Sequence, residues 1–239
     1  MRKSILILLL LFLGKNIFAI DFSFSAGGGG LFGYTFTRYS LRGGELRSTQ
    51  EMDRLDYGAF LFFDATFAVF SLMIQGGYSS FSENMILEAD ALSGNRGTGY
   101  EISLGFSLMG KYPFAVNERV SWFPMIGLEY HVALLQRRQA GGIVYDRSSG
   151  IAIEDRDVNG NPYPLSAWNS LWINIGAGMD HNIIGSLFLR AELLFGIRLP
   201  TRYERGALEV VQEEMGVSNP RLRGLTGNPT FKIGLGYRF

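Results

Sequence analysis

The chain has 239 residues, with 22 basic and 22 acidic side chains and a formal net charge of zero. A neutral chain has no long-range electrostatic field to attract nucleic acid, so we expect no nucleic-acid partner. Cysteine is absent, which excludes a disulfide framework, thiolate metal ligands and a lipid-modified N-terminal cysteine.

Residues 1–19 are expected to be a cleaved secretory signal peptide. Arg2 and Lys3 form its positively charged region, an apolar run follows over residues 5–13, and Ala19 is a small residue at a suitable cleavage point. The apolar run is shorter than the roughly 20 residues that a transmembrane helix needs. We therefore expect residues 20–239 to form one exported domain.

Beyond residue 20, the chain alternates apolar with polar or small side chains, which is the period-two pattern of β-strands. The pattern is cleanest where Tyr100, Ile102 and Leu104 are separated by polar or small residues. Eight such segments can be identified, at about residues 22–36, 57–69, 71–80, 100–109, 120–132, 167–179, 187–199 and 232–239. Repeated segments of this kind are typical of membrane barrels. The sequence therefore predicts an all-β fold, an eight-stranded antiparallel transmembrane up-and-down β-barrel.

The connections between these segments alternate in length. Those after the first, third, fifth and seventh segments have roughly 20 to 35 residues, and the others have only a few, as in outer-membrane barrels with long extracellular loops and short periplasmic turns. This alternation predicts a bacterial outer-membrane location, surface-exposed long loops and two periplasmic mature termini.

Aromatic residues on the lipid-facing positions form two predicted rings. The outer ring consists of Tyr34, Tyr57, Tyr78, Tyr100 and Tyr130, and the inner ring of Phe24, Phe67, Trp122, Tyr237 and Phe239. At a rise of roughly 3.3 Å per residue and a tilt of about 45°, Tyr34 and Phe24 are about 23 Å apart along the barrel axis. This separation is close to the height of the apolar band of membrane barrels.

The opposite positions predict which side chains fill the lumen, since an eight-stranded barrel has an interior just wide enough for side chains. The predicted set is Phe60, Phe62, Asp64, Glu101, Glu129, Trp168, Trp172, Arg190, Glu192, Arg198 and Lys232. One interpretation is a closed plug of paired charges, because unpaired buried charges are costly. The other is a narrow, partly apolar passage with space left by Gly27, Gly29, Gly33 and Gly105. Both interpretations require partners on neighbouring strands for Arg190 and Glu192.

Two loop segments suggest local structure. Asp155, Asp157 and Asn159 match the first half of a calcium loop, but the carboxylate expected at its twelfth position is replaced by Ser166. A tight hairpin turn at Asn159 and the following glycine is the favoured alternative. The apolar pattern of residues 204–215 predicts a short helix in a surface loop. We expect the protein to bind no cofactor.

The last strand resembles the C-terminal recognition signal of bacterial outer-membrane barrels. Lys232, Gly234, Tyr237 and Phe239 match its polar, glycine and aromatic positions. The resemblance implies that the barrel-assembly machinery and outer-membrane lipid are partners of the chain.

The whole predicted barrel resembles the small eight-stranded outer-membrane proteins, most of all the OmpW family. The segments that carry the resemblance are residues 123–127, with a proline inside a strand, and the glycine-rich residues 175–178. It implies a porin-like narrow channel or carrier for small hydrophobic solutes. The alternative is a non-conducting, membrane-anchored scaffold whose extracellular loops bind a partner or mediate adhesion.

We expect no enzymatic activity. His131 and His181 are the only histidines, and the topology predicts them at opposite ends of the barrel, at the outer rim and at a periplasmic turn. A serine hydroxyl and an acidic group both within reach of His131 would instead indicate nucleophilic catalysis.

Overall fold

The computed structural model describes residues 23–43, 46–87, 90–140, 143–146, 164–202, 204–205 and 221–239. The predicted signal peptide of residues 1–19 lies outside the described residues. So do the calcium candidates Asp155, Asp157 and Asn159, and most of the predicted helix over residues 204–215. These three assignments therefore stay predictions.

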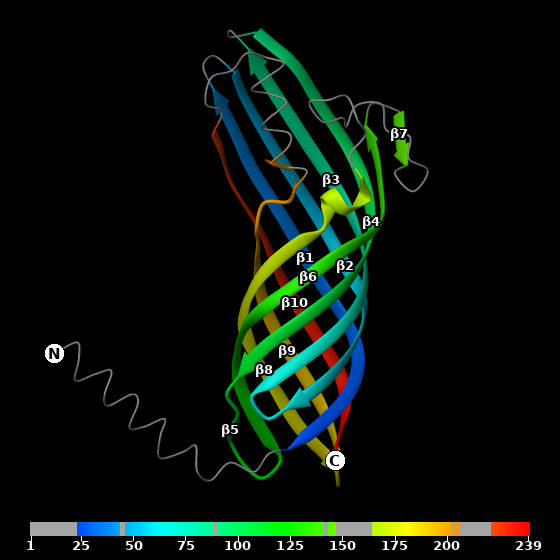
Figure 1. Ribbon diagram of the computed structural model, residues 1–239, viewed down its shortest axis with the longest axis vertical. Coiled ribbons are helices and arrows are strands. Elements are labelled where there is room, and N and C mark those ends of the chain that lie inside the picture. Colours follow the sequence, from blue (N-terminus) through cyan, green and yellow to red (C-terminus); the bar gives the residue numbers. More distant parts are fainter. Residues whose placement is uncertain are drawn as a thin grey trace, which may run out of the picture.

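Eight antiparallel strands form a closed ring (Figure 1). They are β1 (Phe24–Gly43), β2 (Leu46–Ala65), β3 (Ala68–Leu87), β4 (Asp90–Lys111), β6 (Val120–Ala140), β8 (Ser170–Ile184), β9 (Leu187–Arg198) and β10 (Arg221–Arg238). Neighbours in the chain pair with each other, β10 pairs with β1, and the pairing of β4 with β6 continues the ring past the short β5 (Phe114–Ala115). β7 (Ile143–Asp146) adds to the outer part of β6, and the 3₁₀ helix η1 (Leu165–Trp168) precedes β8. The predicted eight-stranded up-and-down barrel is confirmed.

The outer parts of the first four strands correct the prediction of long loops. β1 and β2 pair as far as Gly43 and Leu46, and β3 and β4 pair as far as Leu87 and Asp90, where the sequence predicts loops. In β1 and β2 the outward residues of these parts, among them Arg38, Arg42 and Glu51, are polar. The apolar period-two signal of a lipid-facing strand is therefore missing, although the backbone pairing continues. The strands therefore extend far beyond the segments that the sequence indicates.

The wall of the barrel is uneven in height. β1 to β4 have 20 to 22 residues, whereas β8 has 15 and β9 has 12. β6 pairs with β8 only up to His131, and β10 pairs with β9 only from Gly227 downward. Figure 1 shows the consequence, a tall wall built by β1 to β4 that rises above a low wall at β8 and β9.

The turn between β2 and β3 corrects the predicted end of the second strand. Ala65 pairs with Ala68, so Thr66 and Phe67 form a tight turn, and Thr66 has a positive φ of 26°. Val69 shares the odd numbering of Tyr57 and Phe67, which the sequence predicts to face lipid, but it is fully buried inside the barrel. The turn shifts the inward and outward positions, and Phe67 lies in the turn with its ring 6.1 Å from that of Tyr112.

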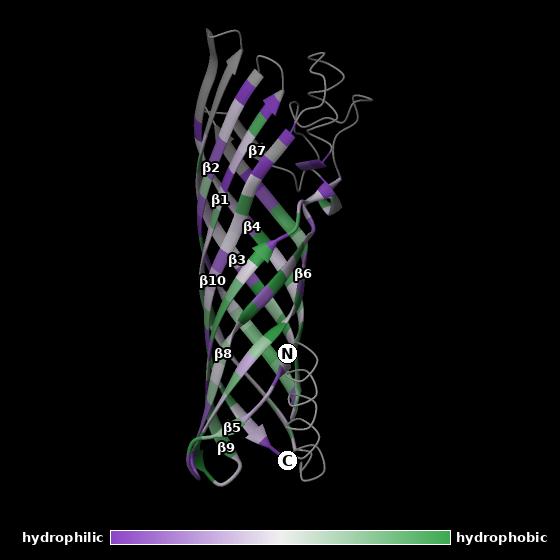
Figure 2. Cartoon of the chain, turned by 90° about the vertical axis from the view of Figure 1, so that its left-hand side faces the viewer, coloured by the Kyte–Doolittle hydropathy of each residue, from purple (hydrophilic) through white to green (hydrophobic). Residues whose placement is uncertain are grey.

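Hydrophobic residues are concentrated in the lower half of the strands, and the coloured upper part is mostly hydrophilic (Figure 2). The outward side chains of the lower half form an apolar surface. Tyr34, Tyr57, Tyr78 and Tyr130 are exposed on this surface, and Phe24, Trp122, Tyr237 and Phe239 are exposed towards the lower end. Tyr100 is partly covered. Within the described residues, no helix has the length and hydropathy to cross a membrane.

Several inward glycines lie under side chains of neighbouring strands. A Cβ atom added at Gly27 would lie 2.7 Å from the ring of Phe62, and one added at Gly234 would lie 3.2 Å from the ring of Phe60. At Gly105, the added atom would lie 3.0 Å from the Met73 methyl group. At these three positions the missing Cβ atom is replaced by a neighbouring side chain, so Gly27, Gly105 and Gly234 allow close packing inside the barrel.

Candidate functional site

A buried ion-pair cluster closes the lower part of the lumen. We call it the Arg190 cluster; it consists of Arg190, Asp180, Asp64 and Lys111. Arg190 of β9 is 1% exposed, and its Nε and Nη2 atoms donate to Oδ1 and Oδ2 of Asp180 on β8 at 2.7 Å each. Nη2 also contacts Asp64 of β2, whose Oδ2 accepts from Nζ of Lys111 at 2.5 Å. Because these residues belong to four strands, the cluster ties separate parts of the wall together.

Aromatic rings enclose this cluster. The Cζ atom of Arg190 lies 4.5 Å from the ring centre of Phe62, 5.2 Å from that of Phe123 and 5.3 Å from that of Phe188. A guanidinium at these distances is attracted by the negative faces of the rings. Together with buried methionine and leucine side chains, the rings belong to one continuous hydrophobic cluster inside the barrel. The lumen at this level is a packed core.

Glu192, two residues from Arg190 on the same strand, is not one of its close partners. Its Oε1 atom is 4.0 Å from Nε of Arg190, and it is buried without a hydrogen-bond partner among the described residues. Arg190 takes its close partners from Asp180 on the neighbouring strand and from Asp64, which sequence alternation places on the same face without indicating the contact. Asp180 is therefore the main partner of Arg190.

A second polar layer lies around Glu129. Its carboxylate is 2.5 Å from Nε2 of His131, 3.6 Å from Nζ of Lys232, and accepts a hydrogen bond of 3.2 Å from Nδ2 of Asn174. Lys232 also lies 3.1 Å from the sulfur of Met73. In this layer the negative charge of Glu129 and the positive charge of Lys232, both predicted to face the lumen, compensate each other.

The sequence predicts His131 at the outer rim, and this prediction is wrong. β6 continues beyond it to Ala140, and the His131 side chain is buried. Oγ of Ser103 is 3.5 Å from its Nδ1 atom, so a serine and an acid, Glu129, both flank this histidine. Ser103 is also buried, and the adjoining cavity has a volume of about 10 Å³. This cavity is lined by His131 and Glu129 and has room for about one water molecule.

A third layer closes the barrel above Glu129. Nε of Arg54 is 2.7 Å from Oδ1 of Asp56, and its Nη1 donates to Glu101 at 2.8 Å. Asp56 also accepts from Oγ1 of Thr35 at 2.5 Å and from Nδ2 of Asn228 at 3.0 Å. Of these residues, only Glu101 is in the predicted lumen set. Arg54 and Asp56 have even numbers on β2, as the predicted lumen residues Phe60 and Phe62 do. This shared parity would have identified Arg54 and Asp56 as inward-facing.

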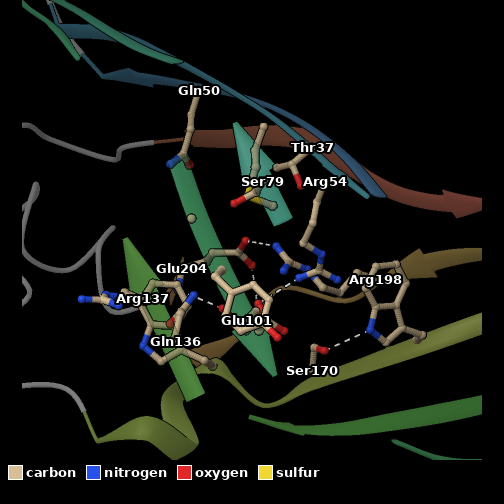
Figure 3. Close-up of a pocket in the computed structure, with 16 residues that line it drawn as sticks. Thr37, Gln50, Arg54, Ser79, Glu101, Gln136, Arg137, Ser170, Arg198 and Glu204 are labelled. Atoms are coloured by element: carbon tan, nitrogen blue, oxygen red, sulfur yellow. Dashed lines mark hydrogen bonds and ion pairs between the residues drawn. The ribbon is translucent and has the colours of Figure 1, made fainter. Parts of the chain in front are cut away.

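A pocket of about 50 Å³ opens above this layer, between the tall and the low wall. Figure 3 shows Arg54 and Glu101 from the tall wall, and Ser170 and Arg198 from the low wall, around the same space. The pocket brings together four residues predicted to line the lumen: Glu101, Trp168, Trp172 and Arg198. The other seven predicted residues lie deeper: Phe60, Phe62, Asp64, Glu129, Arg190, Glu192 and Lys232.

The low side of the pocket is held by short-range contacts. The indole Nε1 of Trp172 donates to Oγ of Ser170 at 2.9 Å. Glu204 contacts Arg198 and also accepts from the backbone N–H of Thr201 at 2.8 Å, while its own N–H donates to Oγ1 of Thr201 at 3.2 Å. This reciprocal pair is a capping box, and the spacing of Thr201 and Glu204 is its sequence signature.

Some buried polar atoms of the pocket make no hydrogen bond to the described residues. Among them are Oε1 of Gln136, an acceptor, and Nε of Arg198, a donor. Buried polar groups normally have partners. The pocket therefore offers both a donor and an acceptor to water or to a small polar molecule entering from outside.

No family model and no curated protein matches the chain. Among solved structures it is similar to the outer membrane protein OprG from Pseudomonas aeruginosa, with 10% identity, a TM-score of 0.45, and coverage of 92% of this chain and 96% of that chain. It is also similar to the outer membrane protease OmpT from Escherichia coli (8% identity, TM-score 0.40, coverage 92% and 99%) and to Neisserial surface protein A (12%, 0.34, 89% and 99%).

At these identities and TM-scores the similarities indicate no shared activity, and the barrel assignment rests on the strand pairing of this chain itself. Its closed ring of eight antiparallel strands has an apolar outward surface with exposed aromatic residues towards both of its margins. The chain therefore has the architecture of an outer-membrane β-barrel.

Proposed function

We propose that this protein is a bacterial outer-membrane barrel whose lumen is closed at the level of the bilayer, and that it works as a membrane-anchored scaffold for binding at the cell surface. The lower, apolar half would lie in the membrane. The tall wall of β1 to β4 and the pocket would lie outside, with the C-terminus in the periplasm, at the lower end in Figure 1.

One observation carries this proposal, namely the packing of the Arg190 cluster among Phe62, Phe123 and Phe188. A water-filled pore needs a barrel of about 16 strands, whereas eight strands enclose a space that side chains fill. The tall outer wall then presents most of the surface that is free to bind a partner.

Planar-bilayer recording of the refolded protein tests this proposal. Heat-dependent gel mobility first establishes that the barrel is folded. We expect no steady conductance from the wild-type protein, and we expect channels from a variant in which Phe62 and Phe188 are both changed to Ala. Stable channels from the monomeric wild-type protein would refute the scaffold proposal.

A carrier of small hydrophobic solutes is the second candidate function, and the pocket supports it, because Trp168 and Trp172 line the space that opens to the outside. Titration of the refolded protein with 1-aminoanthracene, followed by tryptophan fluorescence, tests it. Saturable quenching that Trp172→Phe weakens would favour the carrier. Quenching that is unchanged in a variant with both Trp168→Phe and Trp172→Phe would come from Trp122 on the outer surface and would exclude this site.

A further inference from the structure

Three arginines lie side by side on the outward face of the tall wall. Arg42 of β1 is directly opposite Arg221 of β10 and directly opposite Arg47 of β2, and all three side chains are exposed. We call these three residues the arginine row. Neighbouring residues in an antiparallel pair are about 5 Å apart, so the row places three guanidinium groups across a width of about 10 Å. Arg223 is exposed on the same face, opposite Ser40.

The arginine row has no acidic counterpart in the part of the chain that the structure describes, where no carboxylate forms an ion pair with it. Arg38, on the same face of β1, is different. Its Nη2 donates to Asp53 at 2.9 Å and its Nε is 3.9 Å from Glu51. The chain as a whole is neutral, so the row is a local excess of positive charge.

Like charges directly opposite each other across strands are destabilising. The arginine row therefore costs stability in the isolated barrel, and a multivalent anion between the guanidinium groups would remove this cost. Guanidinium groups pair with phosphate and carboxylate through two parallel hydrogen bonds, which favours such oxyanions over simple halides.

The height of the row indicates where this anion lies. From Tyr34, at the outer margin of the apolar surface, β1 rises roughly 19 Å to Arg42, at about 3.3 Å per residue and about 45° of tilt. The headgroup region of a bilayer is only about 5–8 Å thick on each side. The row thus stands above the headgroups, at the level of saccharides attached to lipids of the outer leaflet.

We propose that the arginine row binds the phosphate-bearing saccharide of an outer-leaflet glycolipid in the same membrane. The inference rests on the proposed orientation, with the tall wall outside, and does not depend on whether the barrel conducts. The bound saccharide would hold the tall wall against the membrane surface and shield the charges of the row.

The test compares the wild-type protein with a variant that carries Arg42→Gln, Arg47→Gln and Arg221→Gln. Both are refolded into vesicles of phosphatidylcholine alone, or of phosphatidylcholine with lipopolysaccharide whose core saccharide is phosphorylated or enzymatically dephosphorylated. The temperature at which the folded gel band disappears is measured for each. Binding of the soluble, phosphorylated core oligosaccharide is measured in parallel by calorimetry at low and high salt.

We expect phosphorylated lipopolysaccharide to raise the unfolding temperature of the wild-type protein, and dephosphorylated lipopolysaccharide to have little effect. The variant should bind the oligosaccharide about tenfold more weakly, which is about 1.4 kcal/mol. High salt should abolish the difference. In phosphatidylcholine alone the variant should be as stable as wild type or slightly more stable, because the repulsion is gone. Arg38→Gln and Arg119→Gln serve as controls and should retain wild-type binding.

Three results would overturn the proposal. Equal stabilisation of wild type and variant by phosphorylated lipopolysaccharide would show that the row does not bind it. A loss of stability of the variant in phosphatidylcholine alone would assign the row a structural role. Binding of the soluble oligosaccharide without any effect of membrane lipopolysaccharide would place the ligand outside the membrane. None of these results bears on the conductance test, so the two proposals can fail separately.

Discussion

Asp180→Asn should strongly destabilise the barrel, whereas Glu192→Gln should not. Both changes replace a buried carboxylate by a neutral side chain of similar size. Asp180 accepts two hydrogen bonds of 2.7 Å from Arg190, while the nearest oxygen of Glu192 is 4.0 Å away. Removing one partner of a buried ion pair costs about 3–5 kcal/mol. Since Asp64 remains in contact with Arg190, we expect the lower limit, about 3 kcal/mol.

For Glu192→Gln we expect a cost of about 1 kcal/mol or less, the net value of an ordinary hydrogen bond. The two variants should thus differ by about 2 kcal/mol, roughly 30-fold in the unfolding equilibrium. Urea titration in lipid vesicles, followed by the folded gel band, measures both values, and an unchanged slope shows that the unfolded state is the same. A cost for Glu192→Gln that equals or exceeds that of Asp180→Asn would refute the assignment of Asp180 as the main partner of Arg190.

Three further predictions concern assembly, topology and packing. Deletion of Phe239 should slow membrane insertion, measured by the heat-modifiable gel band in isolated membranes, because the last strand loses an exposed aromatic anchor; unchanged insertion would contradict the assembly signal. Cysteine at Asn95 should react with an impermeant reagent on intact cells and cysteine at Asn117 should not, and the opposite result would invert the proposed orientation. Gly178→Ala should cost about 1–3 kcal/mol in urea titration, because its Cβ would overlap the Phe123 ring; a neutral effect would show that this ring can move.

Much of the lower half of the barrel could be predicted from the sequence. Lipid on one side and a packed lumen on the other force apolar residues onto every second position, and this alternation is visible without a structure. It correctly assigned the outward tyrosines Tyr34, Tyr57 and Tyr78 and the inward pair Phe60 and Phe62.

The upper half could not be predicted in this way. The outward residues Arg38, Ser40 and Arg42 are polar there, so no apolar residue marks the outward face of this part of β1. Only the pairing of β1 with β2 and β10 shows that this segment is strand. The arginine row likewise exists because the register places residues distant in sequence directly opposite each other.

The partners within the lumen were also decided by the tertiary structure. The sequence alone indicates that Arg190, Asp64 and Asp180 all point inward, because side chains alternate between the two faces of a strand. Which of them meet depends on the closure of the ring and on the shear between strands, which set the relative heights of residues on separate strands. The sequence thus predicted partners on neighbouring strands without naming them, and the barrel brings Asp180 from β8 and Asp64 from β2 to Arg190.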